Sequence, residues 1–241
     1  MGMCCWPREI LKYGKISGDV RMVKLLFPGK IFLLPALLLF SVLFFSKATA
    51  STKQNELENF LQEIQDSSDR VHSFTSGFTQ EKNLSLFSNP VIFQGRLSIV
   101  RPDRLRWEFI SPVPSVLILN GEQGLRCNDK APAEKFKLSA DPVMKMVAEQ
   151  LWFWLGGDYK KLARHHRLEK HDPATLLITP EDQSTANYLE TVAIVFDEKT
   201  LQPLQVEIRE PGGDSTRISF HSSKINMKIP EKLFTQCVSD E

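Results

Sequence analysis

The sequence predicts an α+β fold in which one antiparallel sheet of roughly eight or more strands carries helices at its start and in its middle. Apolar and polar residues alternate with a period of two in segments between residues 71 and 119, and again between 174 and 220. Helical periodicity precedes the first series and separates it from the second. Because no internal repeat or low-complexity linker divides these segments, we expect a single folded domain.

The N-terminal region has the pattern of an export signal. Lys24 and Lys30 form a basic segment, residues 31–45 are an apolar stretch, and residues 48–50 supply the small side chains that a signal peptidase recognises. The apolar stretch is shorter than the ~20 residues that span a bilayer, which favours a cleaved signal over a membrane anchor. An uncleaved membrane helix is the alternative interpretation.

These features define the expected domain boundaries. We predict cleavage between Ala50 and Ser51, so that residues 1–50 are a signal peptide and residues 51–241 are a single domain. Met22 stands immediately before the basic segment and is the alternative start of translation. The predicted domain is long enough to bury a substantial core.

Charge and cysteine content limit the classes of partner and compartment. The whole chain has a net charge of +1, but residues 1–50 hold seven of its 30 basic and two of its 29 acidic residues, which leaves residues 51–241 with −4. This balance argues against nucleic acid as a partner. Cys127 and Cys237 belong to the predicted domain, and in an oxidising compartment they either pair or stay free.

The first predicted helix covers residues 55–66. Its apolar residues recur at helical spacing: Leu57, Phe60, Leu61 and Ile64. Acidic residues occupy the opposite side. A helix with one apolar stripe packs that stripe against a larger element, which here is the predicted sheet.

Strand alternation begins after this helix. Phe78 follows Phe74 at even spacing, and the strand at residues 91–101 places its apolar residues on one face. Those residues are Val91, Phe93, Leu97 and Ile99. Trp107 continues the alternation, and residues 115–119 run into Asn120-Gly121, a strong signal for a hairpin turn.

The densest basic cluster consists of Arg96, Arg101, Arg104 and Arg106. We interpret Arg96, Arg104 and Arg106 as an ordinary solvated strand face. Arg101 differs because its register places it on the apolar face, at the edge. A buried unpaired charge would cost several kcal/mol, so Arg101 either extends to the rim or donates hydrogen bonds to backbone carbonyls beneath a lid.

A second helix is predicted between Asp141, which can cap its first turn, and Gly156-Gly157, which can end it. Its apolar residues include Met144, Met146, Val147, Leu151, Trp152, Phe153 and Trp154. Consecutive apolar residues at its end point all around a helix, so burial is not one-sided. Two interpretations stay open: a buried core helix, or a lid whose methionines and aromatics re-pack against variable apolar ligands.

Catalytic and metal-binding motifs are missing from the sequence. It contains no Gly-x-Ser-x-Gly elbow, phosphate-binding glycine loop, Cys-x-x-Cys or His-Glu-x-x-His motif. His165, His166 and His171 cluster beside Asp172, but adjacent residues of a strand point to opposite faces, so we interpret them as surface residues. We expect neither catalysis nor a metal or cofactor.

Three segments stand in order along the chain: VHSFTSGFTQEK at 71–82, GRLSIVRP at 95–102 and LRW at 105–107. The first is similar to the opening strand of the LolA family of outer-membrane lipoprotein carriers, the others follow at the distances expected for it, and residues 71–125 as a whole resemble that family. The order of elements is similar over residues 55–235. The C-terminal end departs from the pattern, because it shows no extra strand of the kind that some members carry.

The resemblance implies an unclosed, strongly curved antiparallel half-barrel with helices as a lid over an apolar cavity. It implies that Arg101 of the Arg-Pro pair tethers the lid and gates the cavity. The expected cavity residues are Phe78, Val91, Phe93, Leu97, Ile99, Trp107, Leu117 and Leu119. The expected lid residues are Met144, Met146, Val147, Leu151, Trp152 and Trp154.

The resemblance also implies a function and partners. Members of the family are periplasmic, receive acylated lipoproteins from an ATP-driven inner-membrane complex, and pass them to an outer-membrane receptor without a cofactor. We expect this protein to be a monomer that works in the same compartment and in the same way. The alternatives are a periplasmic lipid-sensing or regulatory protein on the same half-barrel, a carrier of another lipid, and an acylhydrolase.

Overall fold

The computed structural model describes residues 46–141, 144–145, 147–149, 151–152, 159–164, 166–171 and 173–237. The chain divides into two compact units, residues 1–56 and residues 57–241. The apolar stretch predicted as the core of a signal peptide lies outside the described residues. Among the helices that are described, none is both long and apolar enough to cross a membrane.

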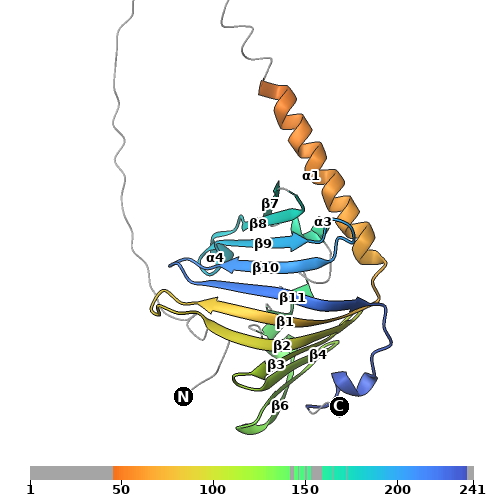
Figure 1. Ribbon diagram of the computed structural model, residues 1–241, viewed down its shortest axis with the longest axis vertical. Helices are drawn as coiled ribbons and strands as arrows, with labels where there is room; N and C mark the ends of the chain where they lie inside the picture. The colour runs from red at the N-terminus through yellow and green to blue at the C-terminus, as the bar shows by residue number, and fades with distance from the viewer. Residues whose placement is uncertain are drawn as a thin grey trace, which may run out of the picture. The chain divides into compact units, whose positions relative to one another are not determined.

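The second unit contains a single open antiparallel sheet, which confirms the predicted fold class (Figure 1). In the described part of the chain it has 11 strands in the order β6-β5-β4-β3-β2-β1-β11-β10-β9-β8-β7, more than the predicted minimum. The strands are β1 (Ser73–Asn83), β2 (Val91–Val100), β3 (Arg104–Ser111), β4 (Ser115–Asn120), β5 (Gln123–Asn128), β6 (Ala131–Lys137), β7 (His166–His171), β8 (Thr175–Pro180), β9 (Thr191–Phe196), β10 (Pro203–Arg209) and β11 (Ser215–Ile225).

The strand order follows from two consecutive meanders. Strands β1 to β6 run outward to one edge, β7 to β11 run inward from the other, and β1 pairs with β11 in the centre. The connection between β6 and β7 therefore leads from one edge of the sheet to the other. Because the predicted lid lies in this connection, its two ends are attached to opposite edges.

Helices complete the second unit. Helix α1 (Ser46–Asp69) is longer than predicted and begins in the first unit; its residues Phe60, Leu61 and Ile64 belong to the second unit and are buried. The ring of Phe60 makes an edge-to-face contact with Phe196 of β9, with centroids 6.0 Å apart. The remaining helices are η1 (Leu138–Ala140), α3 (Tyr159–Leu162), α4 (Gln183–Ala186) and η2 (Glu231–Phe234).

The inner face of the sheet is continuous and mostly apolar, although buried Ser76 and Gln80 of β1 also lie on it. Phe78 of β1 pairs with Gly95 of β2 on one side and with Phe220 of β11 on the other. Its ring lies 4.9 Å from that of Trp107 and 5.5 Å from that of Phe109, centroid to centroid. On the other half of the sheet the same face carries buried Leu176, Ile178, Val192, Ile194 and Val206.

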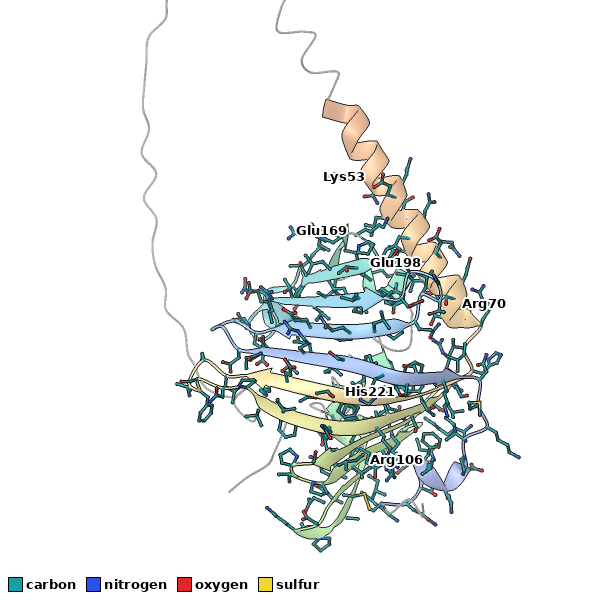
Figure 2. All side chains as sticks on the ribbon, viewed as in Figure 1. Lys53, Arg70, Arg106, Glu169, Glu198 and His221 are labelled. Carbon is teal, nitrogen blue, oxygen red and sulfur yellow. A yellow bond between two sulfur atoms is a disulfide. The ribbon has the colours of Figure 1, made fainter. Side chains whose placement is uncertain are left out.

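Arg106 corrects the prediction of a solvated arginine face, because its side chain is only 2% exposed. Its guanidinium donates hydrogen bonds to the carbonyl oxygens of Leu233, Gln236 and Cys237, at 3.2, 2.8 and 2.9 Å, and forms an ion pair with Glu108. The C-terminal segment that accepts these bonds covers the outer face of β3 and β4. Figure 2 shows Arg106 beside this segment. Strand register had placed the residue on the outer face but could not show what covers it.

The same C-terminal segment is fixed by two further contacts. Cys237 forms a disulfide with Cys127 of β5. The guanidinium of Arg104 lies over the ring of buried Phe234, 5.6 Å from its centroid. The solvated interpretation holds for Arg96, which is exposed on the outer face of β2.

Candidate functional site

The structure places the expected cavity residues on one face of four adjacent strands. Seven of them are buried: Phe78, Phe93, Leu97, Ile99, Trp107, Leu117 and Leu119. Val91 differs, because it lies at the start of β2 and is 37% exposed. It shares the face of the others by register but stands at the rim of the sheet.

The expected lid lies partly within the described residues. Met144, Val147 and Leu151 are helical and buried, and Trp152 is half-buried. Met146 and Trp154 lie outside the described residues. Lys145 and Glu149 are exposed, so the described positions bury one face of the helix.

Asp141 anchors the start of this helix to the sheet. Its carboxylate accepts a hydrogen bond from the backbone N–H of Met144 at 3.0 Å, as expected for an N-cap residue. The other carboxylate oxygen accepts a hydrogen bond from Arg126 of β5, also at 3.0 Å. The guanidinium of Arg126 in turn lies over the ring of Phe136, 4.9 Å from its centroid. One edge of the sheet thus holds the start of the helix.

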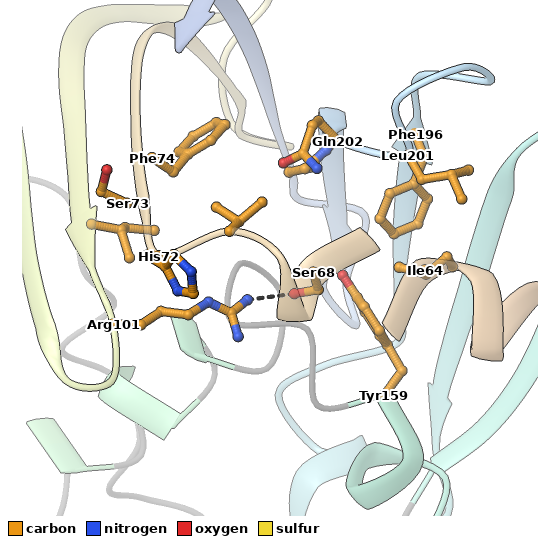
Figure 3. Close-up of a pocket in the computed structure, with 13 residues that line it drawn as sticks. Ile64, Ser68, His72, Ser73, Phe74, Arg101, Tyr159, Phe196, Leu201 and Gln202 are labelled. Carbon is orange, nitrogen blue, oxygen red and sulfur yellow. Dashed lines mark hydrogen bonds between the residues drawn. The ribbon is translucent and has the colours of Figure 1, made fainter. Parts of the chain in front are cut away.

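Arg101 lies at the opposite end of the sheet from the β1–β2 turn, directly after β2. Its backbone N–H donates to the carbonyl of His72 at 2.9 Å, and its guanidinium donates a hydrogen bond to the hydroxyl of Ser68 near the end of α1 (Figure 3). Burial lowers the pKa of the guanidinium, and the nearby carboxylate of Asp69 acts in the opposite direction. The side chain therefore ties a strand turn to a helix.

Tyr159 brings a third segment to this point. It begins α3, it is buried, and Figure 3 shows its side chain directed towards Ser68 and Arg101. Burial raises the pKa of the Tyr159 phenol, and the charge on Arg101 offsets part of this increase. Its ring packs edge-to-face on Phe196, with centroids 5.9 Å apart. Because α3 follows the expected lid in the chain, Tyr159 connects that segment to the Arg101 contact.

The space between the end of α1, the turn after β2 and the start of α3 is small. The pocket that they line, together with Ile64 and Phe74, has a volume of about 20 Å³, enough for roughly one water molecule. The inner face is therefore packed closed beside Arg101. An open hollow of about 530 Å³ lies at the edge of the sheet formed by β5 and β6. It is lined by Gln123, Phe136 and Asp141 among others. No group of three or more metal-ligating side chains occurs among the described residues.

Sequence reasoning did not find Ser68, Asp69 or Tyr159. Each owes its place in the site to the packing of a helix on the sheet, and none interrupts a local pattern. A signal for the covered outer face did exist: Leu233, Phe234, Cys237 and Val238 form two short apolar pairs in an otherwise polar segment. Such residues need a surface to cover them.

The fold and this site together define the class of protein. A single open antiparallel sheet has one continuous, mostly apolar face, and three chain segments meet at one end of it around Arg101. This arrangement is that of a β-sheet protein that shields an apolar interior from water.

Sequence comparison identifies the family within this class. The family model described as outer membrane lipoprotein carrier protein LolA matches residues 69–237, well over half of the chain. The chain belongs to the LolA family, which confirms the resemblance seen in the sequence.

Individual relatives are distant. A protein of Chromohalobacter salexigens named outer-membrane lipoprotein carrier protein is 23% identical over 145 residues, or 59% of this chain and 65% of that protein, slightly under two thirds of its length. A LolA superfamily protein from Nitrosomonas europaea is 13% identical over 73% of this chain and 97% of its own, with a TM-score of 0.39. A chain of the Pseudomonas aeruginosa MucA/MucB complex is 15% identical over 77% of this chain and 64% of its own, with a TM-score of 0.45.

Proposed function

We propose that the protein is a carrier that binds the acyl chains of lipoproteins in its apolar interior and transfers them from the inner to the outer membrane. The observation that carries this proposal is the continuous, mostly apolar inner face of the sheet. Transfer of each acyl CH₂ out of water is worth about 0.8 kcal/mol, so a protein that covers these chains removes the main barrier to crossing an aqueous compartment. Membership of a carrier family supports the same function.

The proposed roles of the residues follow their positions. The seven buried residues of the expected cavity form its wall, with Val91 at the rim. The segment from Met144 to Trp154 is the lid, and Arg101 is the latch that holds the closed form through Ser68. Since the pocket beside Arg101 holds about one water, acyl chains enter by displacing the lid and separating side chains that now pack together.

The proposed compartment is the periplasm. Cleavage between Ala50 and Ser51 releases a single domain, residues 51–241, which works as a monomer without cofactor or catalysis. It receives cargo from an ATP-driven inner-membrane complex and delivers it to an outer-membrane receptor. The disulfide between Cys127 and Cys237 is consistent with an oxidising compartment.

A displacement experiment tests the binding step. The processed protein is loaded with a fluorescent acyl probe and titrated with an acylated lipoprotein, with the same lipoprotein lacking its acyl chains as control. We expect displacement by the acylated form alone. If no acylated cargo displaces the probe, the protein is not a lipoprotein carrier.

A transfer experiment tests the second step. Loaded protein is mixed with acceptor membranes that contain the receptor, and the cargo on the membranes is measured over time. We expect transfer without accumulation of a stable complex. A stable complex with a membrane protein and no transfer would identify a regulatory, lipid-sensing protein instead.

A further inference from the structure

Two neighbouring turns at one end of the sheet expose apolar side chains to solvent. In the β1–β2 turn, Leu86 is 90% exposed and Phe87 is 62% exposed. Ile92 of β2 and Ile110 of β3 are also exposed, and both strands reach the same end of the sheet. We call Leu86, Phe87, Ile92 and Ile110 the tip surface. It lies at the end opposite Arg101 (the left side of Figure 1).

The chain around the tip surface is free of charge. Residues 83–95 contain no acidic or basic side chain, and neither do residues 109–121, although charged residues make up 24% of the whole chain. Lys82 and Arg96 flank the first segment, and Glu108 and Glu122 flank the second. The outer residues of both turns can thus enter an apolar medium without carrying a charge into it, while the carboxylate of Asp214 stays at the base of the first turn, at Ser85.

The exposed turn is held at its base. The backbone N–H of Ser85 donates to the carboxylate of Asp214 at 2.7 Å, and the N–H of Phe87 donates to the carbonyl of Leu84 at 2.9 Å. Asp214 belongs to the β10–β11 turn, so a neighbouring hairpin supports the turn. Leu86 and Phe87 therefore stay exposed on an anchored turn, and no side chain of the described residues covers them.

We propose that the tip surface inserts into the headgroup–acyl boundary of a phospholipid bilayer. Leucine and phenylalanine on a projecting turn bury their area in this layer, as they do on the apolar face of interfacial helices. A protein partner would need a broad complementary area of roughly 800 Å² with a polar rim, whereas this surface is a narrow projection without charges. The inference goes beyond the proposed function, because it assigns a membrane contact that does not involve the cargo cavity.

The charge beside the tip surface predicts the lipid preference. The supporting β10–β11 turn carries Glu210 and Asp214. Hydrogen bonds from Ser85 and, less strongly, the charge of nearby Lys82 lower the pKa of the Asp214 carboxyl. Lys82 flanks the tip surface, so these charges offset one another and give anionic headgroups no net attraction. We therefore expect binding to vesicles of phosphatidylcholine that does not increase when phosphatidylglycerol is added.

Vesicle flotation of the processed protein tests the proposal. The variant combines Leu86→Ser with Phe87→Ser, and the matched control combines Ile225→Ser with Met227→Ser, which removes two exposed apolar residues at the other end of β11. We expect the parent and the control to float with phosphatidylcholine vesicles, and the tip variant to lose on the order of tenfold in partition coefficient or more. Equal flotation of parent and tip variant, or no flotation of the parent, would overturn the proposal.

Other occupants of the tip surface give different results. If it joins two copies of the chain, the parent sediments as a dimer and the tip variant as a monomer, and neither floats. If it binds a protein, a complex from the periplasm is lost in the tip variant while vesicle binding stays absent. Binding of the fluorescent acyl probe, measured in each variant, separates these outcomes from failure of the carrier function, because the cavity lies elsewhere.

Discussion

At the scale of single residues, Arg101 combines two properties that rarely occur together. It is half-buried beside apolar side chains, and it makes a charged hydrogen bond to Ser68 on a different element. A hydrogen bond to a charged group contributes about 1.5–3 kcal/mol. A contact of this size is strong enough to bias a closed form and weak enough to be broken by a cargo that buries several methylene groups.

Replacement of this guanidinium tests the latch. We expect Arg101→Leu to fold normally, because Leu suits the apolar neighbours. We expect it to release a fluorescent acyl probe more slowly, with a dissociation rate that is lower by up to roughly tenfold. The reason is that the closed, empty form loses its hydrogen bond to Ser68 while the loaded form loses little. Stopped-flow dissociation measures the effect. Arg96→Leu, on the exposed face of the same strand, is the control, and an unchanged rate in Arg101→Leu would exclude the latch.

Tyr159 makes stability depend on alkaline pH. Its folded pKa is raised above the unfolded value of about 10, so its contribution is fully present below pH ~10 and is lost as pH rises towards the folded pKa. We expect the free energy of unfolding to fall above pH ~10 by up to about 1.4 kcal/mol per pH unit from this group. Urea unfolding of the parent and of Tyr159→Phe measures the difference. The same slope in both proteins would contradict the assignment.

The sequence could identify Arg101 but not its partners. Leu97, Ile99 and Arg101 share a register, and a cation in an apolar series is visible without a structure. Ser68 and Tyr159 stand in ordinary helical surroundings, and their role arises only when α1 and α3 pack at the end of the sheet. Local periodicity carries no information about such distant contacts.

At the scale of elements, the C-terminal segment acts as a cover for the outer face of β3 and β4. It replaces solvent over Arg106 and Ile118, both of which are buried. Alternation in β3 predicted correctly that Arg106 faces away from the cavity side. It could not predict burial, because the covering residues lie more than a hundred positions later and form no regular strand.

Removal of the Arg106 side chain tests this cover. We expect Arg106→Ala to lower the free energy of unfolding by about 3–5 kcal/mol, because three carbonyls lose their donor and Glu108 loses its partner. Arg104→Ala, at a more exposed position over Phe234, is the control with an expected loss of about 1 kcal/mol or less. Urea denaturation gives both values. Similar losses would show that the segment is not held by the Arg106 hydrogen bonds.

At the scale of the whole molecule, the central strands pack together because Gly95 has no side chain. The ring of Phe78 and the backbone of β3 can therefore approach it closely. A Cβ atom at Gly95 would lie 2.2 Å from the carbonyl oxygen of Glu108 and 2.3 Å from the ring of Phe78. The β2–β3 register shifts between Gln94 and Gly95. The ring of Phe78 thus lies directly over the backbone of the neighbouring strand, and a side chain at this position would push the strands apart.

A pair of glycine variants measures the effect. We expect Gly95→Ala to lower the free energy of unfolding by about 1–3 kcal/mol through overpacking against rigid backbone. Gly77→Ala is the control: its Cβ would meet the exposed ring of His221, which can rotate away, so the loss should be smaller. Thermal unfolding followed by circular dichroism ranks the two. A larger loss in Gly77→Ala would contradict this account of the packing.

The sequence predicted the class of fold better than the extent of the sheet. Strong alternation in β1 to β4 and β8 to β11 identified an antiparallel sheet. Strands β5, β6 and β7 were not predicted. Strand β6 was missed because its residues are almost all exposed, so they carry no alternation of burial. Its position at the edge, beside the start of the predicted lid, depends on strand pairing that no local pattern encodes.

The closed packing beside Arg101 has a consequence for how tightly the proposed cargo can be held. An empty cavity costs about 24 cal/mol per Å³, so a permanent hollow of some 400 Å³ would cost roughly 10 kcal/mol, comparable with the whole stability of a domain. Beside Arg101 the protein avoids this cost, because its own side chains reduce the space there to about 20 Å³. In the proposed carrier, those side chains compete with the acyl chains of the cargo for the same apolar contacts. Affinity becomes a difference between two similar apolar contacts, which keeps loading reversible and lets small changes in packing set the direction of transfer.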